Sequence, residues 1–221
     1  MKAINRRQFV GAAIALTAGA SSPLFAKSGK IAHRTPSRLA PDKLPASARQ
    51  TARPALLAEA LAALDMHGRR LGSRDKLGLV DFSHPSREER FYLVDVAGGR
   101  VEQSWLVAHG KGSDPQNSGF VQRFSNLPGS NASSRGAYLT ANRYYGKHGQ
   151  SQRLIGLDPQ NDAALERAIV IHGAHYVDPA WIDARGLIGR SFGCFAVEDS
   201  AIATVMDQLG EGTLLYAGKS I

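Results

Sequence analysis

The segment that decides the fold is Ile169-Val170-Ile171-His172-Gly173, followed along the chain by Gly189-Arg190-Ser191-Phe192-Gly193-Cys194. Residues 169–171 are apolar and β-branched, which is typical of a buried strand, and this strand ends in an imidazole and a glycine. The second segment contains the single cysteine of the 221-residue chain. We therefore expect the strand with His172 to bring its imidazole within reach of Cys194 at the floor of one open groove.

The cysteine and the histidine together indicate nucleophilic chemistry. A thiol attacks a carbonyl as its thiolate, and a free cysteine is only slightly ionised near pH 7, so it needs a base such as His172. Glycine at 193 permits an unusual backbone conformation, and amides near Ser191, Gly193 and Cys194 are expected to hold an oxyanion. Each residue alone also fits a structural role, as an inert buried cysteine or a packed histidine.

Several segments resemble one known family. His172-Gly173 followed by Ser191-Phe192-Gly193-Cys194 is similar to the His-Gly … Ser-x-Gly-Cys pattern of the L,D-transpeptidase catalytic-domain family, the YkuD-like cell-wall enzymes, and in particular a murein-associated subgroup. The interval from His172 to Cys194 is longer than is usual in the family, which suggests an inserted segment over the site. Directly after the cysteine, Phe195-Ala196 replaces the family's frequent pair of an apolar residue followed by Arg or Asn. Further matching blocks are residues 79–83, 107–110, 124–130, 144–149 and 168–174.

The resemblance implies a strand-rich α+β fold, with mixed β-sheets in a sandwich-like arrangement and a few peripheral helices. It implies that Cys194 attacks an L-to-D peptide bond in a peptidoglycan stem peptide and forms a thioester, with His172 as the base. A backbone carbonyl at or near Gly173 would orient that base. It further implies a transferase of cell wall biogenesis that carbapenems would target.

Other side chains are candidates for substrate contacts. Arg190 could bind a substrate carboxylate bidentately, or could form an ordinary surface ion pair. His175, Tyr145 and His148 could line the pocket or simply pack.

A zinc site is a weaker interpretation of the histidines. No acidic ligand has a recognisable spacing, and the chain is expected to leave the strand between the two histidines that lie closest in sequence. We therefore expect neither a metal nor another cofactor. The histidines in question are His109, His148, His172 and His175.

Two other functions remain open at this stage. The same nucleophile would serve an L,D-carboxypeptidase or another murein cysteine peptidase, and a non-catalytic wall-binding module would use neither residue. The formal charge of +8 favours an anionic polymer such as peptidoglycan, although a merely soluble basic surface fits equally well. No dense Lys/Arg run or aromatic stacking pattern indicates a nucleic-acid partner, and the sequence does not indicate an oligomeric state.

The amino-terminal residues are typical of a targeting segment. Residues 1–26 combine a basic start, with Arg6-Arg7, and a short apolar stretch, which predicts an export signal of the twin-arginine type. We expect a periplasmic or cell-wall-associated protein without stable membrane insertion after cleavage; an uncleaved amino-terminal anchor is the alternative. One cysteine in an exported chain cannot form an internal disulfide, so Cys194 is expected to be free or to pair with another chain. Four prolines predict a linker over 27–54.

A single catalytic domain is predicted over 55–221. Leucines and alanines at helical spacing predict an amphipathic helix at about 55–67, and Asp178 before Pro179 predicts the start of a short helix. A hairpin is predicted around 97–100, a long loop that edges the cleft over 111–131, and a last helix at about 199–209. Further strands are predicted at 136–142, 153–157, 168–172 and 213–217.

Overall fold

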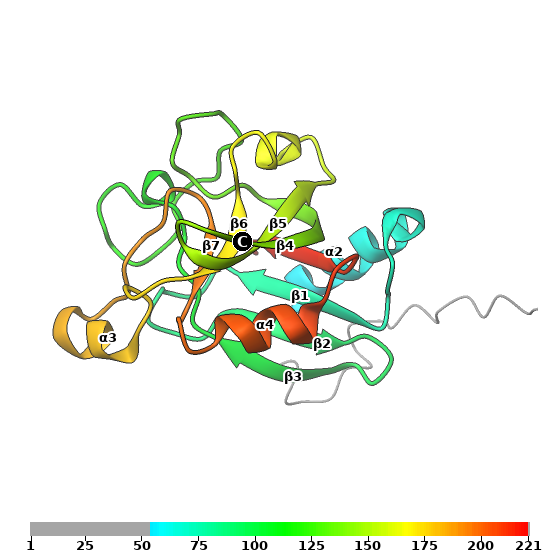
Figure 1. The fold of residues 1–221 in the computed structure, drawn as a ribbon, viewed down its shortest axis with the longest axis horizontal. Coiled ribbons are helices and arrows are strands. Elements are labelled where there is room, and N and C mark those ends of the chain that lie inside the picture. Colours follow the sequence, from blue (N-terminus) through cyan, green and yellow to red (C-terminus); the bar gives the residue numbers. More distant parts are fainter. Residues whose placement is uncertain (1–53, 221) are drawn as a thin grey trace, which may run out of the picture. The chain divides into compact units, whose positions relative to one another are not determined.

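The computed structural model describes residues 54–220, and its eight strands form one mixed sheet (Figure 1). The strand order is β3-β2-β1-β8-β4-β5-β6-β7. This confirms the strand-rich α+β class that the sequence predicted. The strands are β1 (Lys76–Asp81), β2 (Phe91–Asp95), β3 (Arg100–Trp105), β4 (Gly136–Gly146), β5 (Gly149–Gly156), β6 (Val170–Gly173), β7 (Phe195–Val197) and β8 (Leu214–Gly218).

Two regions predicted from the sequence fall outside this description. The export signal over 1–26 lies entirely outside the described residues, and so does the linker over 27–54 except for Pro54, which begins the first helix. Both stay predictions.

Most neighbouring strands are antiparallel, but two pairs are parallel. β1 pairs with β8 in parallel near the middle of the sheet, and β6 pairs with β7 in parallel at its end. Each parallel pair requires a long connection, because a tight turn can join only antiparallel strands. The connection from β6 to β7 contains α3 (Pro179–Arg185), the short helix that the sequence predicted between His172 and Cys194.

The central strands are buried on both faces, and alternate residues enter different cores. On β8, Leu214 and Tyr216 join the core that α2 (Pro54–Met66) covers, whereas Leu215 and Ala217 join the core beneath α4 (Ile202–Leu209). This period of two is the side-chain geometry of a strand, and it explains why β8 is apolar throughout. In Figure 1, α4 crosses one face of the sheet and α2 lies behind it.

The main local predictions are confirmed, with shifted ends. The hairpin of β2 and β3 is present, α2 and α4 are present, and residues 111–131 form a long loop that contains one short 3-10 turn, Lys111–Ser113. The sequence did not predict that β4 continues to Gly146 and turns back directly into β5. Gly149 allows this tight turn because its φ is +73°.

Candidate active site

The parallel pairing of β6 and β7 brings His172 and Cys194 to one cavity. His172 lies opposite Ala196 in the register, and Cys194 comes just before the first residue of β7. Both side chains line a cavity of about 280 Å³. Residues that are distant along the chain therefore share one pocket, as the sequence led us to expect.

The tautomer of His172 follows from its hydrogen bond. Nδ1 lies 2.7 Å from the carbonyl oxygen of Gly173, and this oxygen can only accept, so Nδ1 must be the protonated nitrogen. Nε2 then has a free lone pair, which makes it a proton acceptor. The ring of His148 stacks on the other side of this imidazole, with centroids 4.4 Å apart. His172 is thus held as a neutral base of fixed orientation.

Burial acts on both members of the pair. It raises the pKa of the Cys194 thiol, while the amide of Val170 and the charges of Arg167 and Lys147 act in the opposite direction. Burial lowers the pKa of His172, against its hydrogen bond to Gly173. Since both shifts favour the uncharged forms, the resting site holds a thiol and a neutral imidazole.

The thiol rests against the backbone next to β6. Sγ of Cys194 lies 3.6 Å from the carbonyl oxygen of Ala168, to which it donates a hydrogen bond. Ala168 has a φ of +53°, a left-handed conformation that is uncommon for alanine. Strain of this kind often marks functional sites, and here it aims a carbonyl at the sulfur.

Two glycines are required by close packing around the pair. Gly193 has a φ of +119°, and a Cβ at this position would lie 2.8 Å from the carbonyl oxygen of Ala132. A Cβ on Gly173 would lie 2.6 Å from a carboxylate oxygen of Asp199, at the approach to α4. A side chain at position 193 would therefore displace the backbone at Ala132, and one at position 173 would displace the carboxylate of Asp199.

Ser191 and Gly193 have roles that differ from the prediction. The Ser191 amide donates to the His109 carbonyl at 2.9 Å, and the Gly193 amide donates to the Ser191 hydroxyl at 3.1 Å. That hydroxyl donates in turn to the Cys194 carbonyl at 2.7 Å. Both amides are therefore engaged, that of Ser191 by the distant His109 carbonyl and that of Gly193 by the Ser191 side chain within the turn. Within residues 54–220, no group accepts a hydrogen bond from the Cys194 amide, which remains available as a donor.

The cavity of Cys194 is cationic. Lys147, from the turn between β4 and β5, and Arg167 line it, and no acidic side chain does. Arg167 also binds the carbonyl of Ser125 and the hydroxyl of Ser134, which ties the long loop to the site. Neither cation was predicted from the sequence, since Arg167 has no distinctive local pattern and Lys147 was not singled out within the matching block 144–149.

The other predicted contact residues divide into two groups. His148 lines the cavity of Cys194 and also a neighbouring cavity of about 430 Å³, and His175 and Arg190 line only the second. Arg190 forms no ion pair with a described acid and donates instead to the carbonyl of Asp114. Tyr145 differs from the prediction, since it is 83% exposed and lines neither cavity. Side chains alternate along β4, so Tyr144 takes the inward position instead.

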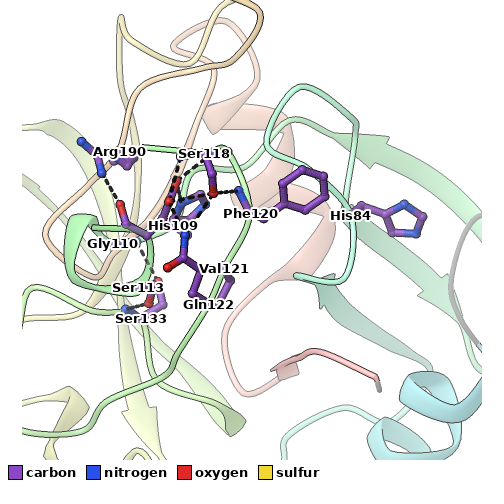
Figure 2. Close-up of polar contacts among 12 residues, drawn as sticks. His84, His109, Gly110, Ser113, Ser118, Phe120, Val121, Gln122, Ser133 and Arg190 are labelled. Atoms are coloured by element: carbon purple, nitrogen blue, oxygen red, sulfur yellow. Dashed lines mark hydrogen bonds and ion pairs between the residues drawn. The ribbon is translucent and has the colours of Figure 1, made fainter. Parts of the chain in front are cut away.

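A buried polar network supports the turn that contains Cys194. Arg90 is fully buried and donates to Nδ1 of His109 at 2.7 Å, and Nε2 of His109 faces a carboxylate oxygen of Asp114 at 3.4 Å. Ser118 and Gln122 lie beside His109 and bind the same carboxylate (Figure 2). This network fixes the start of the long loop.

The long loop holds the turn before Cys194 through backbone hydrogen bonds. The His109 carbonyl accepts a hydrogen bond from the Ser191 amide, and the Ser191 carbonyl accepts one from the Lys111 amide at 2.9 Å. Ser133 links the two segments, since its hydroxyl accepts from the Gly110 amide at 3.0 Å and donates to the Gly193 carbonyl at 3.3 Å. Figure 2 shows Ser133 beside Gly110 and Arg190 on the other side of this junction. The chain around Cys194 is therefore positioned by residues of the distant loop.

The histidines considered as zinc ligands lie in separate environments. His109 lies in the buried network, whereas His172 and His148 stack on each other at the cavity. In the part of the chain that the structure describes, no group of three or more His, Cys, Asp or Glu side chains is arranged to hold a metal ion.

Comparison with known families identifies this arrangement. A family model described as the L,D-transpeptidase catalytic domain matches residues 48–217. The chain belongs to this family. The match includes β1 to β7 and most of β8, and with them both His172 and Cys194. Curated protein sequences gave no match.

Solved L,D-transpeptidases are distantly similar. The enzyme from Mycobacterium smegmatis is 14% identical, with a TM-score of 0.39, over 65% of this chain and 58% of its own. The L,D-transpeptidase LdtMt1, solved in complex with imipenem, is 13% identical with a TM-score of 0.39, over 65% and 59%. The enzyme from Xylanimonas cellulosilytica is 20% identical with a TM-score of 0.39, over 71% and 68%. The chain thus spans less than two thirds of the first two relatives.

Within residues 54–220 of this L,D-transpeptidase family member, no helix is long and apolar enough to cross a membrane.

Proposed function

We propose that this chain is a cysteine-dependent L,D-transpeptidase that acts on peptidoglycan stem peptides through a thioester acyl-enzyme. One observation carries the proposal. The bond from Nδ1 of His172 to the Gly173 carbonyl leaves Nε2 as a base in the cavity that Cys194 lines. A carbonyl thus orients the base in place of the carboxylate of a Ser-His-Asp triad.

Acylation begins when the thiol leaves its resting position at the Ala168 carbonyl. Cys194 gives its proton to Nε2 of His172, and sulfur attacks the carbonyl carbon of an L-to-D peptide bond. The carbon–nitrogen bond then breaks, and the proton passes from His172 to the departing D-residue, which leaves as an amine. The acyl group remains on sulfur as a thioester.

The oxyanion of this step requires donors that are not already engaged. The Cys194 amide meets this condition, and the Ser191 and Gly193 amides do not, because their hydrogen bonds hold the turn. We therefore assign the Cys194 amide as the primary oxyanion donor. Ser191 acts by holding the carbonyl of Cys194, which fixes the peptide plane next to the nucleophile.

The charge of the cavity supports a carboxylate-bearing substrate. Lys147 and Arg167 line it without an acidic partner among the described residues. Stem peptides of peptidoglycan have free carboxylates, which such cations would bind. The same cations stabilise a Cys194 thiolate, so their positive charge would both bind the substrate and activate the nucleophile.

Export belongs to the same proposal, because the polymer lies outside the inner membrane. The twin-arginine-like segment over 1–26 would direct a folded protein to the periplasm or cell wall. Fractionation of cells that express the full chain, with an Arg6→Lys, Arg7→Lys variant as the control, tests this point. We expect the variant to stay inside the cell.

A carbapenem tests the nucleophile directly. Intact-protein mass spectrometry after incubation with imipenem should show one added drug mass on the wild type and none on Cys194→Ala. Cys194→Ser provides a matched variant with nearly unchanged shape. Folded wild-type protein that acquires no mass would contradict the proposal and would favour a non-catalytic wall-binding module.

The fate of the thioester separates the transferase from a hydrolase. Incubation with a disaccharide-tetrapeptide should yield cross-linked dimers if an amine resolves the thioester. Tripeptide alone would assign the chain as an L,D-carboxypeptidase with the same nucleophile and base.

A further inference from the structure

The second cavity, of about 430 Å³, adjoins the cavity of Cys194. The two share the side chains of His148, Tyr176 and Phe192. One wall consists of Trp181 and Arg185, which belong to α3. The segment between His172 and Cys194 therefore helps to form a compartment next to the cavity that Cys194 lines.

This compartment contains three cations and no acid. Lys111, Arg185 and Arg190 line it, no Asp or Glu does, and none of the three forms an ion pair with an acidic residue in the range 54–220. Unpaired cations that converge on one cavity lower the free energy of an anion bound there. Arg190 donates one N–H to the Asp114 carbonyl, and its other N–H groups can donate to a ligand.

Two of these cations are held over aromatic rings. Nζ of Lys111 lies 4.6 Å from the ring centroid of Phe192, and the guanidinium carbon of Arg185 lies 4.1 Å from that of Trp181. A cation–π contact fixes the position of a charge without neutralising it, so the N–H groups at the ring edge can still donate. The aromatic faces also offer apolar surface to the aliphatic part of a ligand.

We propose that this second cavity, which we call the α3 cavity, binds the free carboxylates of the acceptor stem peptide. This inference rests on the proposed function. The bound peptide would present its amine across the boundary formed by Phe192 and Tyr176, toward the thioester on Cys194. The nitrogen then attacks the thioester carbon, a C–N bond forms and the C–S bond breaks. The amine proton passes to Nε2 of His172 and from there to sulfur, which restores the thiol.

The acceptor fits this cavity better than the donor for a geometric reason. The donor carbonyl must lie against sulfur, in the smaller cavity with its own cations, Lys147 and Arg167. A second set of cations beyond Phe192 can serve a second carboxylate-bearing peptide while the first is attached. Holding the amine close to the thioester raises its effective concentration, which lets it compete with water.

Binding can be measured without catalysis. In the Cys194→Ala background, the indole N–H signal of Trp181 is followed by NMR during titration with disaccharide-tetrapeptide and with its carboxyl-amidated counterpart. We expect Arg185→Gln and Lys111→Gln each to weaken binding of the free acid about tenfold, the loss of one charge-assisted hydrogen bond. Arg100→Gln, which removes an exposed cation on β3 at the other edge of the sheet, should leave the affinity unchanged. Equal affinity for acid and amide, or no effect of either variant, would overturn the proposal.

Turnover with Cys194 intact tests the assignment to the acceptor. Arg185→Gln should form the imipenem adduct at the wild-type rate, while its ratio of dimer to tripeptide falls about tenfold. An unchanged ratio together with normal adduct formation would overturn the acceptor role. Absence of the adduct in the wild type would instead contradict the proposed function and would leave the NMR result to decide the ligand of the α3 cavity.

Discussion

Two of the four His-Gly pairs in this chain, those that begin at His109 and His172, have opposite chemistry. His172 donates from Nδ1 to the Gly173 carbonyl and keeps Nε2 free at the cavity. His109 precedes Gly110, but its Nδ1 accepts from Arg90 and its Nε2 therefore carries the proton and faces Asp114. The two rings are opposite tautomers, and only His172 has a lone pair available to a substrate.

The environments explain this difference. His109 is fully buried, and both of its ring nitrogens are engaged by charged groups, so it stiffens the loop and cannot accept a further proton readily. His172 is fixed at one nitrogen only and borders open space. A histidine becomes a base when its surroundings orient it and leave one nitrogen unsatisfied. The dipeptide itself does not decide this.

Removing the base should have the largest effect. His172→Gln should slow acylation by imipenem about 10²- to 10⁴-fold, which is the usual contribution of a general base. Its free energy of unfolding should change little, because glutamine can still donate a hydrogen bond. Stopped-flow acylation and urea unfolding measure the two quantities, with His84→Gln as the control at a histidine outside the cavities. An acylation rate within a factor of three of wild type would remove His172 from its role.

Breaking the buried network should chiefly cost stability. Arg90→Met leaves Nδ1 of His109 and the carbonyl oxygens of Val107 and His84 without their donor, for which we expect about 3–5 kcal/mol of destabilisation in urea unfolding. Arg100→Met, at an arginine whose side chain is 60% exposed, should cost well under 1 kcal/mol, as expected for a surface ion pair. Similar values for both variants would mean that the network does not stabilise the loop.

Acid should weaken the fold through His109. Burial, followed by the charge of Arg90, lowers the pKa of His109 below its ordinary value, so the unfolded chain binds a proton that the folded chain does not. Burial acts to raise the pKa of Asp114, but hydrogen bonds from Ser118 and Gly119 lower it overall, so this carboxyl adds a further loss of stability only below about pH 4. Stability should therefore fall as the pH drops below about 6.5, the ordinary histidine value. In His109→Gln, the free energy of unfolding should depend less on pH below about 6.5, as measured by urea unfolding at several pH values. The same pH dependence as in the wild type would show that His109 is not responsible.

The smallest expected effect is a shift in the pH profile of acylation. Burial lowers the pKa of His172, so this base stays unprotonated below the ordinary histidine range and the acid limb of the acylation rate should lie below about pH 6.5. His148 contributes to this lowering as a neighbouring charge. The acid limb of His148→Gln should therefore move to higher pH in stopped-flow measurements. A shift to lower pH would show that stacking, rather than charge, dominates the contact.

Local sequence was sufficient where local geometry decides the structure. The hairpin of β2 and β3 follows from apolar residues on both sides of a turn, and α3 begins where Asp178 accepts a hydrogen bond from the Ala180 amide ahead of Pro179. Glycine at 193 was likewise noted as permitting an unusual backbone conformation, and its φ is +119°. These features depend on neighbours within a few residues.

The residues that surround the reactive pair depended on distant contacts. Lys147 reaches the cavity because the turn from β4 to β5 lies beside β6, and Arg167 points into it while it binds the long loop. Neither has a local pattern that differs from an exposed cation. The engaged amide of Ser191 was equally hidden, since its partner is the carbonyl of His109.

The sequence by itself determined the strand-rich class and pointed to a candidate nucleophile and a candidate base, because alternating apolar segments, a single cysteine and a His-Gly after a β-branched run are properties of the chain. The tertiary structure decided which nitrogen of His172 and of His109 is protonated, which amide next to the cysteine stays without an acceptor, and where five cations gather that form no ion pair within residues 54–220. Protonation and hydrogen-bond availability are set by burial and by partners far along the chain, and only the folded arrangement defines these.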